Sequence, residues 1–147
     1  GNKDIIGKIT ILKQSTDLCT SILSQLIAYE YCQMGKIEEN IKSNIKIYKK
    51  KRDAMINALK KHFPKKATWT EPHGGFFIVA TLPDYIDTGE MFKEAIEEKV
   101  AYVPGGPFFA DGKGQNTMRL SFCYPSEKDI DEGIKRLGKV IKKRIKY

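Results

Sequence analysis

One arginine stands where it could bind a negatively charged ligand. Arg119 lies within residues 117–124, a segment whose apolar and polar residues alternate as they do in a β-strand. An unpaired charge is costly to bury, and a guanidinium matches a carboxylate through two parallel hydrogen bonds. Arg119 therefore either clamps the carboxylate of a ligand or forms a salt bridge with an acidic residue of its own chain. The residues alone leave both alternatives open.

A loop rich in proline and glycine precedes Arg119 in the chain. Residues 104–107 read Pro-Gly-Gly-Pro, and two aromatic residues, Phe108 and Phe109, follow directly. Proline and glycine give such a loop a defined backbone shape. The two rings either form the wall of a ligand pocket or fill the core beneath a tight connection, and the sequence is compatible with both.

The other residue types that could do chemistry form no recognisable set. His62 and His73 are not adjacent in the sequence and are interpreted as surface residues. They complete neither a metal-ligating cluster nor a catalytic triad. Cys19, Cys32 and Cys123 show no C-x-x-C spacing and are typical of reduced thiols. Neither glycine-rich phosphate-binding pattern is present. We therefore predict no catalytic and no metal-ligating residue within this chain.

Helical periodicity dominates the first half of the chain. Residues 3–13 form a predicted helix with Asn2 as its cap, followed by a polar break at residues 14–16. A second helix is predicted from Asp17, with Gly35 at its C-terminal end. Residues 37–63 carry the clearest apolar stripe, with steps of three and four, and Pro64 ends that helix.

The second half alternates between strand and helix patterns. Short strands are predicted at residues 67–70, 75–82, 100–103 and 117–124. The run at 75–82 is almost continuously apolar, which predicts burial of both its faces. Helices are predicted after Asp87 or Thr88, and after Ser126, where Asp129 completes an acidic variant of the capping box. The order predicts an α+β fold, with a small open, mostly antiparallel sheet covered by helices on one side and preceded by a long linking helix.

Composition narrows the class of protein. The chain has 147 residues, of which 41% are hydrophobic, enough for a core without disulfides. No apolar run reaches the roughly 20 residues that span a bilayer, so we expect no membrane partner. The net charge is +8, from 26 basic and 18 acidic residues, but the basic runs lie on predicted helices. Solvated helix faces explain that charge, and we do not expect nucleic-acid binding.

Several short motifs occur in order along the chain. They are Lys13-Gln14, Asp17-Leu18, Ser24-Gln25, Tyr48 with Arg52-Asp53, Pro72-x-Gly74-Gly75-x-Phe77, Val103-Pro104-Gly105 with Phe108, and Arg119-Leu120-Ser121-Phe122. The ordered set resembles the C-terminal part of fold-type-I, pyridoxal-phosphate-dependent aminotransferases of classes I and II. Within that group it is most similar to the aminoadipate, aromatic and kynurenine aminotransferases, and the resemblance covers essentially the whole chain.

The resemblance implies a division of the chain and a role for Arg119. Residues 1–35 would be the tail of the large cofactor-binding domain, and residues 36–147 the C-terminal small domain. Arg119 matches the family's arginine that binds the α-carboxylate of the substrate. Amino acids and 2-oxo acids are therefore the implied substrates.

The resemblance also implies what this chain lacks. The lysine that forms the Schiff base with pyridoxal 5'-phosphate would precede Gly1, and Lys3, Lys8 and Lys13 stand in no matching motif. We therefore expect a fragment that alone neither holds the cofactor nor turns over. The full-length protein is expected to be a cytoplasmic homodimer of amino acid metabolism.

Two alternatives come from other classes of protein. The chain could be the C-terminal part of an aminotransferase-like effector domain in a helix-turn-helix transcriptional regulator, which only the far N-terminus of the parent protein would reveal. It could also be a freestanding ligand- or RNA-binding module that uses its positive charge, and such a module would bind polynucleotides in a salt-sensitive way.

Overall fold

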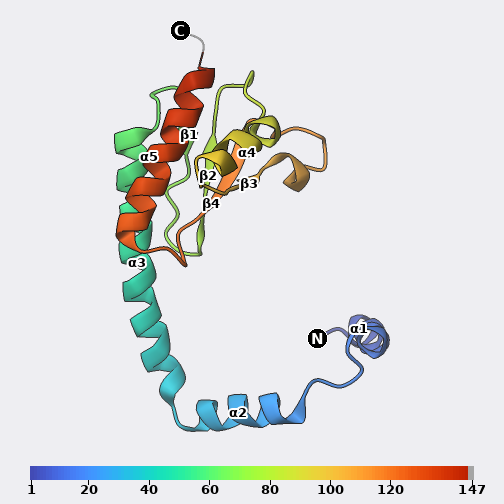
Figure 1. The fold of residues 1–147 in the computed structure, drawn as a ribbon. Coiled ribbons are helices and arrows are strands. Elements are labelled where there is room, and N and C mark those ends of the chain that lie inside the picture. Colours follow the sequence, from blue (N-terminus) through green and yellow to red (C-terminus); the bar gives the residue numbers. More distant parts are fainter. Residues whose placement is uncertain (146–147) are drawn as a thin grey trace. The chain divides into compact units, whose positions relative to one another are not determined.

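The computed structural model describes residues 1–145, which fall into two compact units, one from Gly1 to Ser43 and one from Asn44 onward. The elements are α1 (Lys3–Thr16), α2 (Ile22–Gln33), α3 (Lys36–His62), β1 (Thr68–Trp69), β2 (Phe77–Thr81), α4 (Thr88–Glu97), β3 (Val103–Pro104), the short 3₁₀ helix η1 (Gly106–Phe108), β4 (Thr117–Ser121) and α5 (Glu127–Arg144) (Figure 1). This order confirms the predicted α+β fold with a long leading helix.

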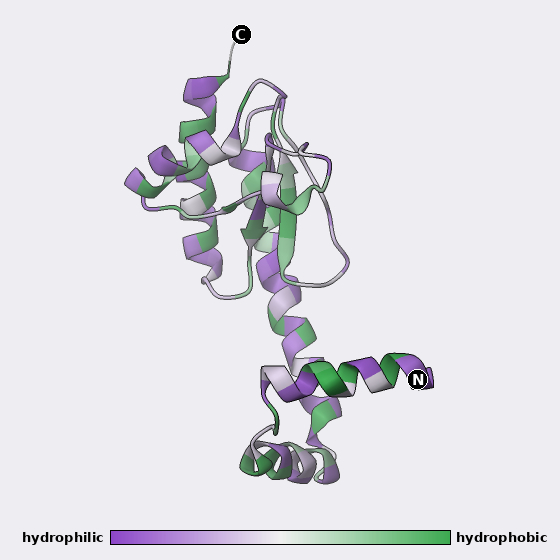
Figure 2. Ribbon diagram, turned by 90° about the vertical axis from the view of Figure 1, so that its right-hand side faces the viewer, coloured by the Kyte–Doolittle hydropathy of each residue, from purple (hydrophilic) through white to green (hydrophobic). Residues whose placement is uncertain are grey.

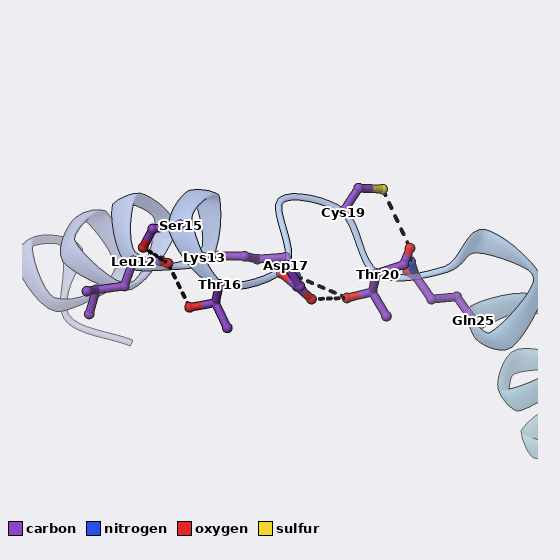
Figure 3. A network of polar contacts seen from close by, with 8 residues as sticks. All are labelled: Leu12, Lys13, Ser15, Thr16, Asp17, Cys19, Thr20 and Gln25. Carbon is purple, nitrogen blue, oxygen red and sulfur yellow. Dashed lines mark hydrogen bonds and ion pairs between the residues drawn. The ribbon is translucent and has the colours of Figure 1, made fainter.

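Helix α1 is longer than predicted. The Asn2 side chain caps it as expected, but the helix continues through the polar residues at 14–16. The hydroxyls of Ser15 and Thr16 each donate to the Leu12 carbonyl oxygen at 2.9 Å, so they bond within the helix instead of breaking it (Figure 3). The predicted break was therefore wrong.

The second helix starts later than predicted. Asp17 belongs to the end of α1, where its carboxylate lies 2.7 Å from Lys13 Nζ and its backbone N–H donates to the Lys13 carbonyl oxygen (Figure 3). Helix α2 begins only at Ile22, with the Ser21 side chain as its cap. Gly35 takes a φ of +67° just beyond α2, in the left-handed conformation that the prediction assigned to it.

The first unit buries none of its helical apolar side chains. The large hydrophobic residues of α1 and α2 are all exposed, and both helices carry green, hydrophobic segments in Figure 2. Apolar area of this extent normally marks a surface that packs against something else.

The second unit contains the hydrophobic core. Its sheet has the order β1-β2-β4-β3, and each pair of neighbouring strands described is antiparallel. Ile78 pairs with Leu120, and Val79 pairs with Arg119, so successive pairs face opposite sides of the sheet. This register fixes which side chains meet the helices.

One face of the sheet is packed and the other is open. Ile78, Ala80, Met118 and Leu120 are at most 4% exposed and join one core cluster with residues of α3, α4 and α5. The alternate residues of β2, Phe77 and Val79, are 43% and 39% exposed. The prediction that both faces of this strand are buried was therefore wrong for residues 44–145, because all three helices of this core lie on one side.

Helices α3 and α5 lie side by side at one edge of this core (Figure 1). Gly138 of α5 leaves no room for a side chain, because a Cβ there would lie 2.6 Å from the His62 carbonyl oxygen. His62 Nε2 lies 3.0 Å from an Asp131 carboxylate oxygen, and only 14% of the histidine side chain is exposed. His62 therefore joins the two helices, and its interpretation as a surface residue was wrong.

Candidate functional site

Arg119 lies in the middle of β4 and points to the open face of the sheet. Val79 of β2 and Val103 of β3 are its direct partners in the register, so it is flanked by apolar strands on both sides. Leu120, its neighbour in the chain, is buried on the packed face. The alternation of residues 117–124 predicted this placement, and the structure confirms it.

Two aromatic rings contact the guanidinium from different elements. The Cζ atom of Arg119 lies over the Phe77 ring, 4.3 Å from its centroid, and over the Phe108 ring, 4.9 Å from its centroid. Both distances are within the range of cation–π attraction, in which the negative face of an aromatic ring stabilises a cation. The rings thus hold the charged group without neutralising it.

No acidic side chain pairs with Arg119 among the residues that the structure describes. The ion pairs of residues 1–145 join acidic residues to other arginines, to lysines and to His62, and the Arg119 Nε is buried without a hydrogen-bond partner in this part of the chain. Of the two alternatives for this arginine, the internal salt bridge is therefore not found here. A buried N–H donor without a partner is unusual in proteins, and it sets Arg119 apart from the paired arginines of this chain.

The loop before β4 is tightly connected to it and still presents an aromatic ring outward. The Gly105 N–H donates to the Thr117 carbonyl oxygen at 2.8 Å, and a Cβ on Gly105 would lie only 1.8 Å from Thr117 Oγ1. Phe108 follows in η1 and remains 59% exposed, while Phe109 is also exposed. The rings therefore do not fill the core beneath the connection, and Phe108 forms part of the open face.

A buried polar contact fixes the base of this loop. The Thr88 hydroxyl, at the start of α4, is shared between the carbonyl oxygens of Gln115 and Thr117, at 2.9 and 2.7 Å. The Tyr102 hydroxyl donates to the Thr88 carbonyl oxygen at 2.6 Å, and burial raises the pKa of Tyr102 well above its ordinary value. These bonds tie the start of α4 to the residue before β3 and to the start of β4.

Sequence reasoning found Arg119 and Phe108 but placed neither Phe77 nor Thr88 at the candidate site. Phe77 ends the Pro-x-Gly-Gly-x-Phe motif, so a signal for it was present, but its contact with Arg119 depends on the strand register. Thr88 was considered only as an alternative start of α4. The N-cap of α4 is Asp87, the first of the two predicted residues, and its side chain accepts from the N–H groups of Gly89 and Glu90.

Among the described residues, the other polar features form no second site. A depression of about 420 Å³ beside α3 includes Arg52, Lys60 and His73 in its lining. Arg52 pairs with Asp53 and Lys60 with Glu71, so two of its cations already have partners.

In residues 1–145 no group of three or more His, Cys, Asp or Glu residues could hold a metal ion. None of the helices in the same range is long and apolar enough to cross a membrane.

Comparison with solved structures first defines the class of protein. The chain superimposes on the kynurenine aminotransferase of Pyrococcus horikoshii with a TM-score of 0.92 and 48% sequence identity, over 100% of this chain and 36% of that one. The four-stranded open sheet with its helices is thus the fold of an aminotransferase small domain. A family model, Aminotransferase class I and II, matches residues 1–137. The chain therefore belongs to the class I and II aminotransferase family.

Two curated relatives carry different names. Aromatic-amino-acid aminotransferase 1 of Thermococcus litoralis is 49% identical over 96% of this chain and 34% of its own length. A Bacillus subtilis protein named as an uncharacterized HTH-type transcriptional regulator, YisV, is 33% identical over 92% of this chain and 28% of its own length. The chain thus spans about a third of the length of the curated relatives that it matches.

The family implies pyridoxal phosphate, but the residues beside Arg119 do not fit that cofactor by themselves. Phe77, Phe108, Val79 and Val103 offer neither an amine for an imine bond nor donors for a phosphate group. Within residues 44–145, the open face therefore presents a cation without an acidic partner, and it does not present a cofactor cradle.

Proposed function

We propose that the chain is the C-terminal part of a pyridoxal-phosphate-dependent aminotransferase, and that Arg119 binds the α-carboxylate of its amino acid and 2-oxo acid substrates. The observation that carries this proposal is the uncompensated charge of Arg119 on the open face of the sheet. A guanidinium without an acidic partner is ready to accept a carboxylate through two parallel N–H donors. Membership of the aminotransferase family supports the same assignment.

The division into domains is part of this proposal. Residues 1–35 form the tail of the large cofactor-binding domain, and residues 36–147 form the small domain that carries Arg119. The exposed apolar residues of α1 and α2 support the first assignment, since such surfaces normally pack against further structure. In the longer polypeptide, residues outside this chain hold pyridoxal phosphate, and the whole protein acts as a cytoplasmic homodimer.

A second candidate function has its own support. The match to YisV means that an aminotransferase-like region of this kind also occurs in a protein named as a helix-turn-helix regulator. In that case Arg119 would bind the carboxylate of an effector amino acid without turnover. The two candidates differ in the reaction. An enzyme converts an amino acid to its 2-oxo acid when a second 2-oxo acid is supplied, whereas a regulator binds the amino acid and leaves it unchanged.

The experiment that tests the proposal uses the full-length polypeptide loaded with pyridoxal phosphate. A panel of amino acids is assayed for transfer to a 2-oxo acid, first with the unchanged protein and then with Arg119→Met. We expect KM to rise sharply for every amino donor, because each shares the α-carboxylate. Arg136→Met is the control, since Arg136 pairs with Glu132 on the surface of α5 and should leave KM unchanged. An unchanged KM in Arg119→Met would refute the assignment, and binding without turnover would favour the regulator.

A further inference from the structure

The way in which Arg119 is held carries a further inference. Charged side chains in proteins are commonly fixed by an oppositely charged partner, as Arg136 is by Glu132 at 2.9 Å and Arg52 by Asp53 at 2.6 Å. Arg119 has no such partner among residues 1–145. Its contacts are instead the faces of two rings, Phe77 from β2 and Phe108 from η1.

Aromatic faces and carboxylates hold a guanidinium with different consequences. A carboxylate occupies the in-plane N–H donors and cancels the charge, so it would compete with any incoming anion. A ring contacts the flat face of the group, leaves the in-plane donors unoccupied and keeps the positive charge intact. The rings also restrict the rotation of a long side chain, and this lowers the entropy that a ligand must remove on binding.

Both rings have positions that the fold sets. Phe77 is paired with Ser121 in the β2–β4 register, which places it two residues along from the direct partner of Arg119. Phe108 is held by the turn in which its N–H donates to the Gly105 carbonyl oxygen at 2.9 Å, while Gly105 itself is bonded to Thr117. The two contacts therefore come from the packed strands and from the tightly connected loop, and they converge on one cation.

We propose that Phe77 and Phe108 are positioning residues that hold the Arg119 guanidinium in place for a substrate carboxylate. This inference rests on the proposed function. They act through the arginine and in place of an internal acidic partner. The affinity for the carboxylate then depends on the aromatic character of positions 77 and 108, even where the substrate does not touch either ring.

The experiment measures binding and turnover separately in the full-length polypeptide loaded with pyridoxal phosphate. The probe is 3-phenylpropanoate, which has a carboxylate but no amino group to react, and 3-phenylpropanamide is its neutral counterpart. Calorimetric titration should show that Phe77→Leu and Phe108→Leu each raise the Kd of the carboxylate about 3- to 10-fold. The Kd of the amide should stay the same, and KM for amino donors should rise while kcat changes little.

The chain offers a matched control for each ring. Phe76 is also exposed, but its ring packs edge-on against Tyr48 at 4.9 Å, and no contact joins it to Arg119 among the described residues. Phe109 is the exposed neighbour of Phe108 and likewise makes no such contact in that part of the chain. Phe76→Leu and Phe109→Leu should leave the Kd of the carboxylate within twofold.

Two further readouts separate positioning from a merely structural role. Phe77→Tyr and Phe108→Tyr keep the aromatic face and should restore the affinity that the leucine variants lose. The Hε proton of Arg119, observed by nitrogen-edited NMR in ¹⁵N-arginine-labelled protein, should carry a ring-current shift that both leucine variants reduce. Leucine variants with an unchanged Kd would overturn the inference, and so would tyrosine variants that bind as weakly as the leucine variants.

Failure of the inference and failure of the proposed function give different results. If Arg119→Met raises the Kd of the carboxylate and the phenylalanine variants do not, only the positioning role is wrong. If Arg119→Met leaves the Kd unchanged, the carboxylate site itself is wrong and the positioning role falls with it.

Discussion

The two faces of the four-stranded sheet differ sharply, although they share the same strands. On one face Ile78 and Leu120 pair across β2 and β4 and are sealed by helices. On the other face the next pair, Val79 and Arg119, is partly exposed and carries the only charged side chain of the two central strands. A step of one residue along β2 or β4 therefore leads from a core position to a position at the candidate site.

The difference shows how this unit divides its tasks. The packed face supplies the hydrophobic burial that stabilises the fold. The open face buries little within residues 44–145, and it holds a cation that no acidic residue of that range neutralises. Substitutions on the packed face should therefore change stability, whereas substitutions on the open face should change ligand binding.

Neighbouring residues of β2 give the largest expected contrast in stability. Ile78→Ala should lower the free energy of unfolding by about 3 kcal/mol, because it leaves a cavity in the packed core. Val79→Ala should cost less than about 1 kcal/mol, since Val79 is already partly in solvent. Urea unfolding followed through the fluorescence of Trp69, the single tryptophan, measures both. Equal costs at the two positions would mean that the faces do not differ as described.

Two glycines of α5 sharpen the comparison by giving effects of opposite sign. Gly138→Ala should destabilise the protein by about 1–3 kcal/mol, because its Cβ would collide with the His62 carbonyl oxygen. Gly133→Ala should stabilise it by about 0.5–1 kcal/mol, since a Cβ there meets nothing within 4 Å and alanine favours the helix. Thermal unfolding of both variants checks the signs, and a loss of stability in Gly133→Ala would contradict the packing.

A smaller effect should come from an ion pair between α4 and α5. Hydrogen bonding to Arg144 holds the pKa of the Glu94 carboxyl below its usual value, so Glu94 stabilises the fold above its unfolded-state pKa. That contribution is lost as the pH falls through the lowered pKa of the folded state. Glu94→Gln should therefore reduce stability at neutral pH by less than about 1 kcal/mol.

Unfolding of this variant at pH 7 and at pH 2 provides the check. The gap between Glu94→Gln and the unchanged protein should be smaller at the acidic pH, because protonation of the carboxyl as the pH falls removes the charge that pairs with Arg144. A gap of the same size at both pH values would show that the glutamate acts through packing and not through its charge.

The sequence predicted those features that depend on short-range periodicity. The helix after Ser126, the alternation around Arg119 and the caps at Asn2 and Ser126 all follow from residue spacing, and the structure confirms them. The extension of α1 was missed because the hydroxyls of Ser15 and Thr16 bond back into the helix, although such residues usually weaken one.

Features that depend on long-range contacts were out of reach. The apolar run of β2 suggests burial on both sides, but the positions of the helices decide which side is covered. The meeting of Phe77, Phe108 and Arg119 requires three elements in register, and no local pattern encodes it. The candidate site could thus be predicted as one arginine but not as an arginine held by two rings.

The most direct test of the central claim is the Kd of 3-phenylpropanoate for the full-length polypeptide and for its Arg119→Met variant, measured by calorimetry. If Arg119 is the carboxylate site, the variant should bind the probe about 100-fold more weakly, while its affinity for the neutral amide is unchanged. A variant that binds the carboxylate within twofold of the unchanged protein would contradict the account.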